Sequence, residues 1–416
     1  MIKKIGNVSN TFFIVLLTLC YSLYAGTPPV DLFNPYDVLL EPRRCSSRCL
    51  QIATTFESSF AEKGVQADDY EISKKFRIEG NPLQLWQCKQ NISASLQDQE
   101  NFINDPDIVQ LLIDTDDDDE LLVTPSADFK ARSFLWAIRF YVNPHLSVGI
   151  FIPFYFLKLK NVQWLSSSPQ NADLINQLLK GIGQEGCLDL FNGWTRNGIG
   201  DCAALVYWYK EYPQYKRWLK QVGWNLRTGL IFPTGKKKNE NILLGTALGN
   251  DAGTGILAAG RLDLQFGQNV HFGIDGEFTH FFGNTRKRRI KTNSEQTDLL
   301  FINKVSAYKQ FGFIQHYTLY LTFERFFRCF TFQCAYQYTK QSENRLFLCS
   351  NHFNPAIVNG AESLDEYTTH HGFFALKYDP EDCGYRPTIS LFYKPGFNGK
   401  RALILDSLGF EISVNF

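Results

Sequence analysis

Three stretches of the sequence carry residue types that bind metals or nucleotides, or that cleave peptide bonds. Residues 114–120 read DTDDDDE, a carboxylate run suited to calcium, but it lacks the glycine and the distal glutamate of an EF-hand loop. Residues 229–236 (GLIFPTGK) differ from a phosphate-binding P-loop, because five residues separate the glycines and no Ser or Thr follows the lysine. Residues 198–201 (GIGD) match the sequence motif of intramembrane aspartyl proteases, but that active site requires membrane helices, which this sequence does not predict. We therefore predict a solvated loop and two strand ends, with no metal and no cofactor.

A serine hydrolase built on a barrel would need a serine and a histidine paired on adjacent strands at the outer rim. His370 and His371 fall near the predicted top of a strand, but no serine has a position that singles it out. Histidines at a solvated loop end explain the pattern better. We predict no catalytic residue and no enzyme.

Nine cysteines follow the first 25 residues. No two of them have CxxC spacing and no histidine sits at ligand distance, so disulfides or free thiols are favoured over a zinc site. An odd number leaves at least one thiol free or bonded to another molecule. They are Cys45, Cys49, Cys88, Cys187, Cys202, Cys329, Cys334, Cys349 and Cys383.

The N-terminus has the pattern of an export signal. Lys3 and Lys4 precede an apolar run at residues 11–20, which is too short to span a bilayer, and Ala25 offers a small residue for cleavage. We predict a signal peptide over residues 1–25, followed by a periplasmic segment over residues 26–48. A membrane anchor is the alternative reading of the same run.

The composition suits strands that lie between two solvents. The chain has 36 Phe, 19 Tyr and 7 Trp, and 44% hydrophobic residues, yet it contains no later apolar run long enough for a membrane helix. Its 42 basic and 42 acidic residues balance, so nothing suggests nucleic acid as a partner.

The last fifteen residues, 402–416, alternate with a period of two, which is typical of a β-strand with one polar face. A strand that ends on an aromatic residue resembles the closing strand of an outer-membrane β-barrel, in which the terminal Phe is part of the signal read by the barrel assembly machinery. An edge strand of a soluble β-sandwich is the alternative. The apolar face, which we assign to lipid and to assembly, consists of Phe410, Ile412, Val414 and Phe416.

Eleven further segments show the same alternation, and their connections are alternately long and short. Short periplasmic turns and long external loops distinguish outer-membrane barrels, whereas a β-sandwich has no reason to alternate long and short connections. The sequence therefore predicts an all-β fold: a transmembrane antiparallel up-and-down β-barrel of about twelve strands over residues 49–416. The strand segments are 51–60, 129–142, 146–159, 200–212, 221–234, 256–266, 270–282, 311–325, 329–340, 367–379, 385–394 and 402–416; the long external loops are 62–128, 160–199, 235–254, 284–309 and 341–366.

Three short motifs resemble a known family of barrels. Residues 198–201 (GIGD), 229–235 (GLIFPTG) and 248–251 (LGND) are similar to the strand starts, strand ends and following loop of outer-membrane barrels of the phenol-degradation MetA-pathway type. The resemblance covers residues 197–282 and the terminal Phe. It implies an outer-membrane channel for small, often hydrophobic molecules. The chain departs from the family in its many cysteines and in the long segment 62–128.

The polar faces of the predicted strands carry charged residues on one side only. A charge that faces lipid near the midplane costs about 2–4 kcal/mol for Arg or Lys, so these side chains are expected to point into the lumen. They either line a water-filled path or pair across the lumen and fill it. The predicted lumen residues are Glu57, Arg139, Arg227, Arg261, Asp263, Asp275, Glu277, His316, Glu324, Lys377, Arg386, Lys394 and Glu411.

These patterns predict a channel in the bacterial outer membrane for passive diffusion of small solutes or ions through a polar lumen of mixed charge. The expected partners are outer-membrane lipid, the barrel assembly machinery and the solute itself. The alternative function is a structural or adhesive surface protein that uses the barrel as an anchor and is cross-linked by disulfides to envelope partners. The sequence leaves open the solute, the oligomeric state, and whether residues 62–128 plug the lumen.

Overall fold

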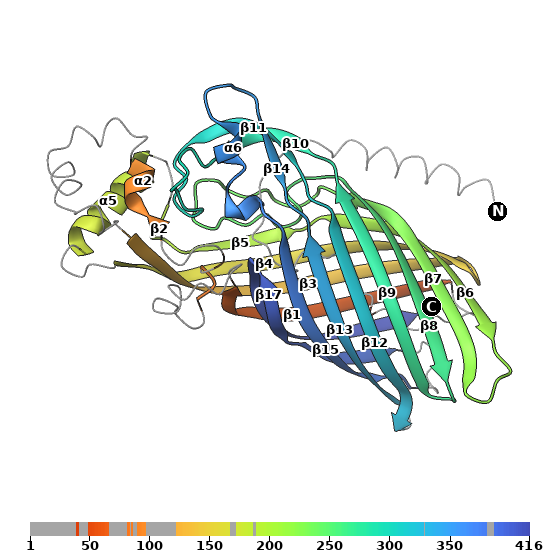
Figure 1. The fold of residues 1–416 in the computed structure, drawn as a ribbon. Helices are drawn as coiled ribbons and strands as arrows, with labels where there is room; N and C mark the ends of the chain where they lie inside the picture. The colour runs from red at the N-terminus through yellow and green to blue at the C-terminus, as the bar shows by residue number, and fades with distance from the viewer. Residues whose placement is uncertain are drawn as a thin grey trace, which may run out of the picture.

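The computed structural model shows a tilted antiparallel barrel with short helices and loops gathered at one end (Figure 1). The predicted signal peptide (1–25), the acidic run (114–120) and Arg386 lie outside the residues that the structure describes, as does the predicted periplasmic segment (26–48) apart from Leu39 and Leu40. The described residues are 39–40, 49–65, 81–83, 85, 90–96, 122–166, 172–185, 189–327, 329–380 and 387–416.

Twelve strands form the barrel, and each overlaps one of the twelve predicted segments. Neighbours in sequence pair antiparallel, and the pairings of β1 with β18 and of β3 with β4 close the ring. The predicted fold class is confirmed. The barrel strands are β1 (Leu50–Val65), β3 (Leu122–Asn143), β4 (Leu146–Ser166), β6 (Cys202–Pro213), β7 (Leu219–Phe232), β8 (Gly255–Phe266), β9 (Val270–Phe281), β12 (Ile314–Phe327), β13 (Phe330–Gln341), β15 (Tyr367–Tyr378), β16 (Thr388–Lys394) and β18 (Ala402–Asn415).

The predicted long loops contain further regular structure. The bounds of 62–128 and 160–199 are wrong because β1, β3 and β4 extend into them, whereas 235–254 and 341–366 agree with the strand ends to within two residues. β1, β3 and β4 extend beyond the stretches in which apolar and polar residues alternate, because their backbone pairing continues past the apolar outer zone of the barrel. β5 (Trp194–Ile199) pairs with the outer half of β4 and continues the line of β6. The remaining elements are β2 (Gln90–Asn91), α2 (Ile92–Leu96), α5 (Ala172–Glu185), β10 (Asn284–Arg289), β11 (Lys304–Gln310), β14 (Arg345–Leu348), α6 (Pro355–Val358), η3 (Glu362–Leu364) and β17 (Gly396–Lys400).

The short connections lie at the end of the barrel opposite to the helices (Figure 1). Between β3 and β4 the Asn143 side chain accepts the backbone N–H groups of His145 and Leu146, at 2.7 and 2.9 Å, which closes a tight turn. Between β8 and β9 the turn uses Gly267 at φ +61°, a conformation that other residues rarely adopt. The barrel thus has a short-turn end and a long-loop end.

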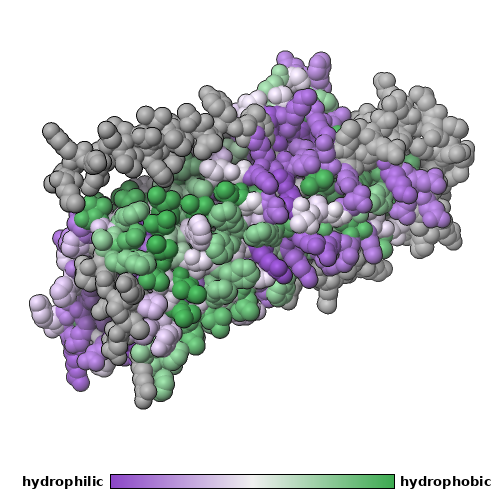
Figure 2. Space-filling view, turned by 180° about the vertical axis from the view of Figure 1, so that it is seen from behind, coloured by the Kyte–Doolittle hydropathy of each residue, from purple (hydrophilic) through white to green (hydrophobic). Residues whose placement is uncertain are grey.

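On the face that Figure 2 shows, the outside of the barrel is apolar over a continuous zone. Trp136 on β3 is 50% exposed and Leu391 on β16 is 56% exposed, and similar side chains occupy the outward positions of the other strands. So much exposed apolar surface is unfavourable in water and is accommodated by lipid. Among the described helices, none is long and apolar enough to cross a membrane.

The closing strand β18 has the two faces that its sequence predicts. Phe410, Ile412 and Phe416 point outward, while Glu411 and Ser413 are buried inside. The strand is held at its end by Phe416, whose carbonyl oxygen accepts the backbone N–H groups of Cys49 and Leu50 at 3.2 and 3.4 Å. These bonds lie on the seam between the first and last barrel strands.

Candidate functional site

The predicted lumen residues all lie away from the outer surface, as far as the structure describes them. Arg227, Asp275, Glu277, His316 and Glu411 are buried. The other seven described members are partly exposed: Glu57, Arg139, Arg261, Asp263, Glu324, Lys377 and Lys394. Arg386 is not described, so its prediction stays open.

Three neighbouring strands bring a charged cluster together inside the barrel. Arg227 on β7 donates two hydrogen bonds to the Asp275 carboxylate on β9, at 2.6 and 2.7 Å, and a third to Glu277 at 3.1 Å. Arg261 on β8 lies 3.6 Å from Asp275. The bidentate geometry fixes both partners, and Asp275 is 0% exposed. These predicted lumen residues therefore act as one ion-paired unit.

A second polar cluster lies on the same wall, nearer the short-turn end. Asp263 on β8 is 2.8 Å from His271, which in turn is 3.3 Å from Glu324 on β12. The Tyr320 hydroxyl donates to Asp263 at 2.7 Å. The predicted set omits His271, although the alternation that identifies Asp275 and Glu277 also places His271 on the inner face.

Beside the charged cluster and partly on the same strands, the lumen wall is apolar, which the predicted polar lumen of mixed charge did not include. Phe151, Leu205, Tyr207, Ile231 and Leu257 point inward from four consecutive barrel strands and pack together. These strands are β4, β6, β7 and β8, with Ile231 near the outer end of β7. Arg139 lies over the Tyr207 ring at 4.2 Å, which joins this wall to the charged residues. The lumen surface is therefore amphiphilic.

Leu39 and Leu40 lie inside the barrel, although they belong to the segment predicted to be periplasmic. Leu39 is 2% exposed, and both leucines pack with the inward side chains Phe373 and Phe392. The Lys377 ammonium donates a 2.6 Å hydrogen bond to the Leu39 carbonyl oxygen. For these two residues the prediction is wrong, because the apolar patch on β15 and β16 buries them.

Apolar side chains from the long-loop end form one cluster with the inner faces of the strands. It joins Leu157 of β4 and Leu403 of β18 to Leu179 of α5 and to Leu248 and Leu300 in two separate loops. Burying these side chains holds the loops over the barrel mouth. We call this cluster the cap.

The loop between β7 and β8 is held down by a buried aspartate at the junction of β5 and β6. The Asp201 carboxylate accepts the backbone N–H groups of Gly235, at 2.9 Å, and of Asn250. Gly249 sits directly against it at φ +156°, and a Cβ there would lie 2.4 Å from the carboxylate. The GIGD and LGND motifs therefore meet in space and fasten this loop.

Replacing Gly249 by alanine is expected to detach the loop, because the new methyl group clashes with Asp201 and the backbone conformation is strained. We expect a loss of about 1–3 kcal/mol and faster protease cleavage within residues 233–254 of the folded barrel. Gly260→Ala is the matched control, since a Cβ there meets only the Leu226 side chain, at 3.5 Å. Equal cleavage rates in the two variants would contradict this account of the motif.

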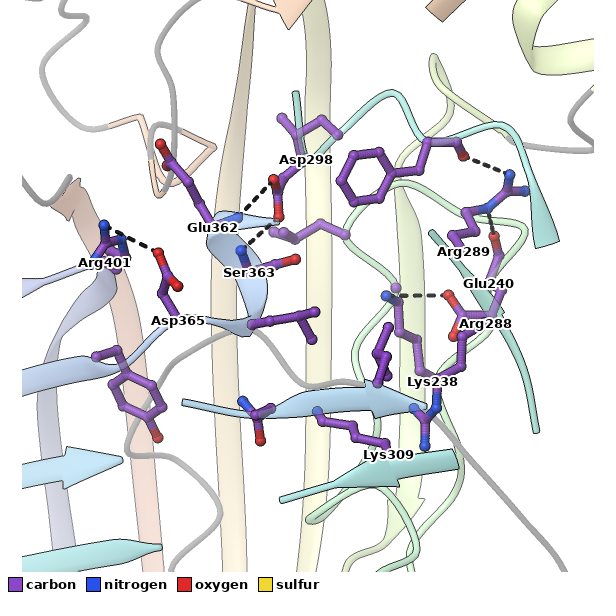
Figure 3. A pocket seen from close by; sticks show the side chains of 18 of the residues that line it. Lys238, Glu240, Arg288, Arg289, Asp298, Lys309, Glu362, Ser363, Asp365 and Arg401 are labelled. Atoms are coloured by element: carbon purple, nitrogen blue, oxygen red, sulfur yellow. Dashed lines mark hydrogen bonds and ion pairs between the residues drawn. The ribbon is translucent and has the colours of Figure 1, made fainter. Parts of the chain in front are cut away.

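A pocket of about 130 Å³ lies at the outer mouth, among the loops that follow β7, β9 and β13 (Figure 3). Several charged residues around it are held in place. Lys238 pairs with Glu240 at 3.3 Å, Arg401 pairs with Asp365 at 3.2 Å, and Asp298 accepts the backbone N–H groups of residues 362 and 363. We call this the mouth pocket.

One end of the mouth pocket carries an excess of positive charge. Arg288 donates to Asp251 at 2.9 Å, and Arg286 lies 2.6 Å from Glu240. Lys309 on β11 completes the group, and burial lowers the pKa of its ammonium to about 7 despite the attraction of Asp251. β11 belongs to the small sheet β10–β11–β14, which is separate from the barrel sheet.

The described residues include no group of three or more His, Cys, Asp or Glu side chains that could hold a metal ion. Five of the nine cysteines are described, and all five are free thiols: Cys49, Cys202, Cys329, Cys334 and Cys349. The two histidines considered for catalysis point to opposite sides of β15. His370 faces outward and hydrogen-bonds Tyr336 at 2.6 Å, while His371 is buried inside.

No model of a known protein family matches the chain, and no curated protein matches it. Among solved structures, an outer-membrane channel from Pseudomonas putida F1 aligns with 90% of this chain and 100% of its own, at 8% identity and a TM-score of 0.51. The CymD monoaromatic hydrocarbon channel (10% identity, 95% and 99% of the chains) and a FadL homologue from Pseudomonas aeruginosa (10%, 88% and 89%) both give TM-scores of 0.33, too low to support an argument. The first likeness shows the fold: the chain is a β-barrel of the bacterial outer membrane type, and that membrane is where such a barrel resides.

Proposed function

We propose that this protein is an outer-membrane channel for the passive diffusion of small solutes. The observation that carries the proposal is the amphiphilic lumen: an ion-paired cluster around Arg227 lies directly beside an apolar wall that contains Leu205 and Tyr207. Next to these buried groups, Arg139 and Arg261 are partly exposed on the polar side and Leu135 and Ala137 on the apolar side, so a solute can exchange water for contacts of both kinds. The earlier likeness to barrels of the MetA-pathway type supports the same reading, and membership of that family is part of the proposal.

A surface anchor is the second candidate. The observation in its favour is the cap, since a barrel whose mouth is filled by packed loops can serve to hold those loops outside the cell. The disulfide-linked form of this candidate would need the cysteines that lie outside the described residues, because the five described ones are free.

Recordings in planar lipid bilayers decide between the two candidates. We expect discrete conductance steps from the purified, folded protein, and small ones, because the cap and the two leucines narrow the lumen. Heat-modifiable migration in electrophoresis gives an independent measure of the folded fraction. Preparations that are fully folded by that measure and pass no current would contradict the channel proposal and leave the anchor.

A further inference from the structure

We propose that the mouth pocket binds a small solute bearing a carboxylate, and that the Lys309 ammonium holds that carboxylate beside the positive charge of Arg288. The inference rests on the proposed function, because it names the class of solute that the channel would accept. It is carried by the pocket itself and by a buried cation that points into it (Figure 3).

Lys309 is 7% exposed, and its Nζ lies 4.8 Å from the centre of the Phe311 ring. Within the described part of the chain, no acceptor forms a hydrogen bond with this ammonium. A buried ammonium is costly unless it is paired, and it has three hydrogen-bond donors to satisfy. An anion in the pocket would supply the missing partner.

The charges that face Lys309 also favour an anion. The cations are Lys238, Arg286 and Arg288, and the carboxylates are Asp251 and Glu240. At this end of the pocket four cations, with Lys309 included, therefore share two carboxylates, while Asp298, Glu362 and Asp365 line the other end together with Arg401 (Figure 3). The Nε of Arg288 is buried and has no acceptor among the described residues. Lys309 thus has unused donors, and the Arg288 guanidinium, whose Nη atoms bond Asp251 and Asn284, adds positive charge beside them.

The rest of the lining indicates that the anion also has an apolar part. Leu243, Leu299, Phe301 and Leu346 line the same pocket. Its volume of about 130 Å³ is well above the roughly 10–15 Å³ that one water needs by the same kind of measure. A short-chain or aromatic carboxylate fits these features better than a bare inorganic anion does.

Binding of benzoate to the full-length, detergent-solubilised barrel, measured by titration calorimetry, tests the site. Lys309→Met is expected to weaken binding at least about tenfold, because it removes a charged hydrogen bond. Lys309→Arg should retain most of the affinity. Lys287→Met is the matched control, since Lys287 lies on the exposed face of the neighbouring strand β10 and does not line the pocket.

Two further probes test the chemistry. Benzyl alcohol has the same ring without the charge and is expected not to bind. Chloride is expected to compete only weakly. Lys309→Met is expected to fold normally, because methionine has a similar length and no charge to bury. Heat-modifiable migration in electrophoresis measures its folded fraction.

The pH dependence provides a readout that a purely structural role would not produce. Lys309 must be protonated and benzoate ionised, so affinity should be full between about pH 5 and pH 6 and fall as the pH rises through about 7. Lys309→Arg should bind equally from about pH 6 to about pH 9, since a guanidinium stays charged.

The outcomes separate this inference from the proposed function. A barrel that conducts but binds no benzoate, or that binds it equally well as Lys309→Met, would overturn the site alone. Binding of chloride or benzyl alcohol as tight as that of benzoate would do the same. A barrel that binds benzoate through Lys309 but passes no current would overturn the channel and leave the site.

Discussion

Replacing Arg227 by methionine is expected to destabilise the folded barrel by about 3–5 kcal/mol. The substitution leaves the buried Asp275 carboxylate without its bidentate partner and removes the guanidinium that lies 3.1 Å from Glu277. Arg261, at 3.6 Å from Asp275, remains and limits the loss. Urea unfolding of the barrel in lipid vesicles, followed by tryptophan fluorescence, measures the change.

Two further variants separate a lost ion pair from a lost side chain. Arg227→Met combined with Asp275→Leu is expected to lose less than Arg227→Met alone, because no isolated charge stays buried at that position. Lys216→Met is the control, since Lys216 is exposed in the turn after β6 and its loss should cost less than about 0.5 kcal/mol. A loss below about 1 kcal/mol for Arg227→Met would mean that water solvates the cluster well enough to replace the pair.

The barrel strands could be predicted because one physical constraint acts at every second residue. In β9, for example, Phe272, Ile274 and Phe278 face lipid while Asp275 and Glu277 face the lumen, and neither set tolerates the other environment. The same alternation placed Arg227 and Arg261 on inner faces. It does not reveal which of these charges pair, because pairing depends on the register between strands.

The cap, the small outer sheet and the mouth pocket could not be predicted in this way. Leu179, Leu248 and Leu300 meet in one cluster although they come from three different loops, and no period relates them. Lys309 belongs to a stretch that reads as a basic loop, and only the fold of β10, β11 and β14 buries it. The apolar wall could not be predicted from the alternation either, because the inward residues Leu205 and Tyr207 alternate with equally apolar outward residues.

Replacing Leu39 and Leu40 together by aspartate is expected to release these residues from the lumen and to increase the conductance. Each buried leucine contributes about 2–3 kcal/mol, and two carboxylates among Phe373, Phe392 and Tyr320 exceed the single positive charge that Lys377 offers beside Leu39. A free-energy change of this size lowers the ratio of barrels that hold residues 39 and 40 in the lumen to barrels that do not by at least about a hundredfold. Single-channel recordings should show larger steps, or a larger fraction of time in the open state.

Lys377→Met should act in the same direction but more weakly, since it removes one hydrogen bond to the Leu39 carbonyl oxygen and leaves the apolar contacts. Leu165→Asp is the control, because Leu165 is exposed near the outer end of β4 and has no part in the lumen. Conductance that stays unchanged in a folded Leu39→Asp, Leu40→Asp barrel would show that these residues do not limit the path. The restriction would then have to lie at the cap, where the loop-releasing Gly249→Ala variant should be the one that raises the current.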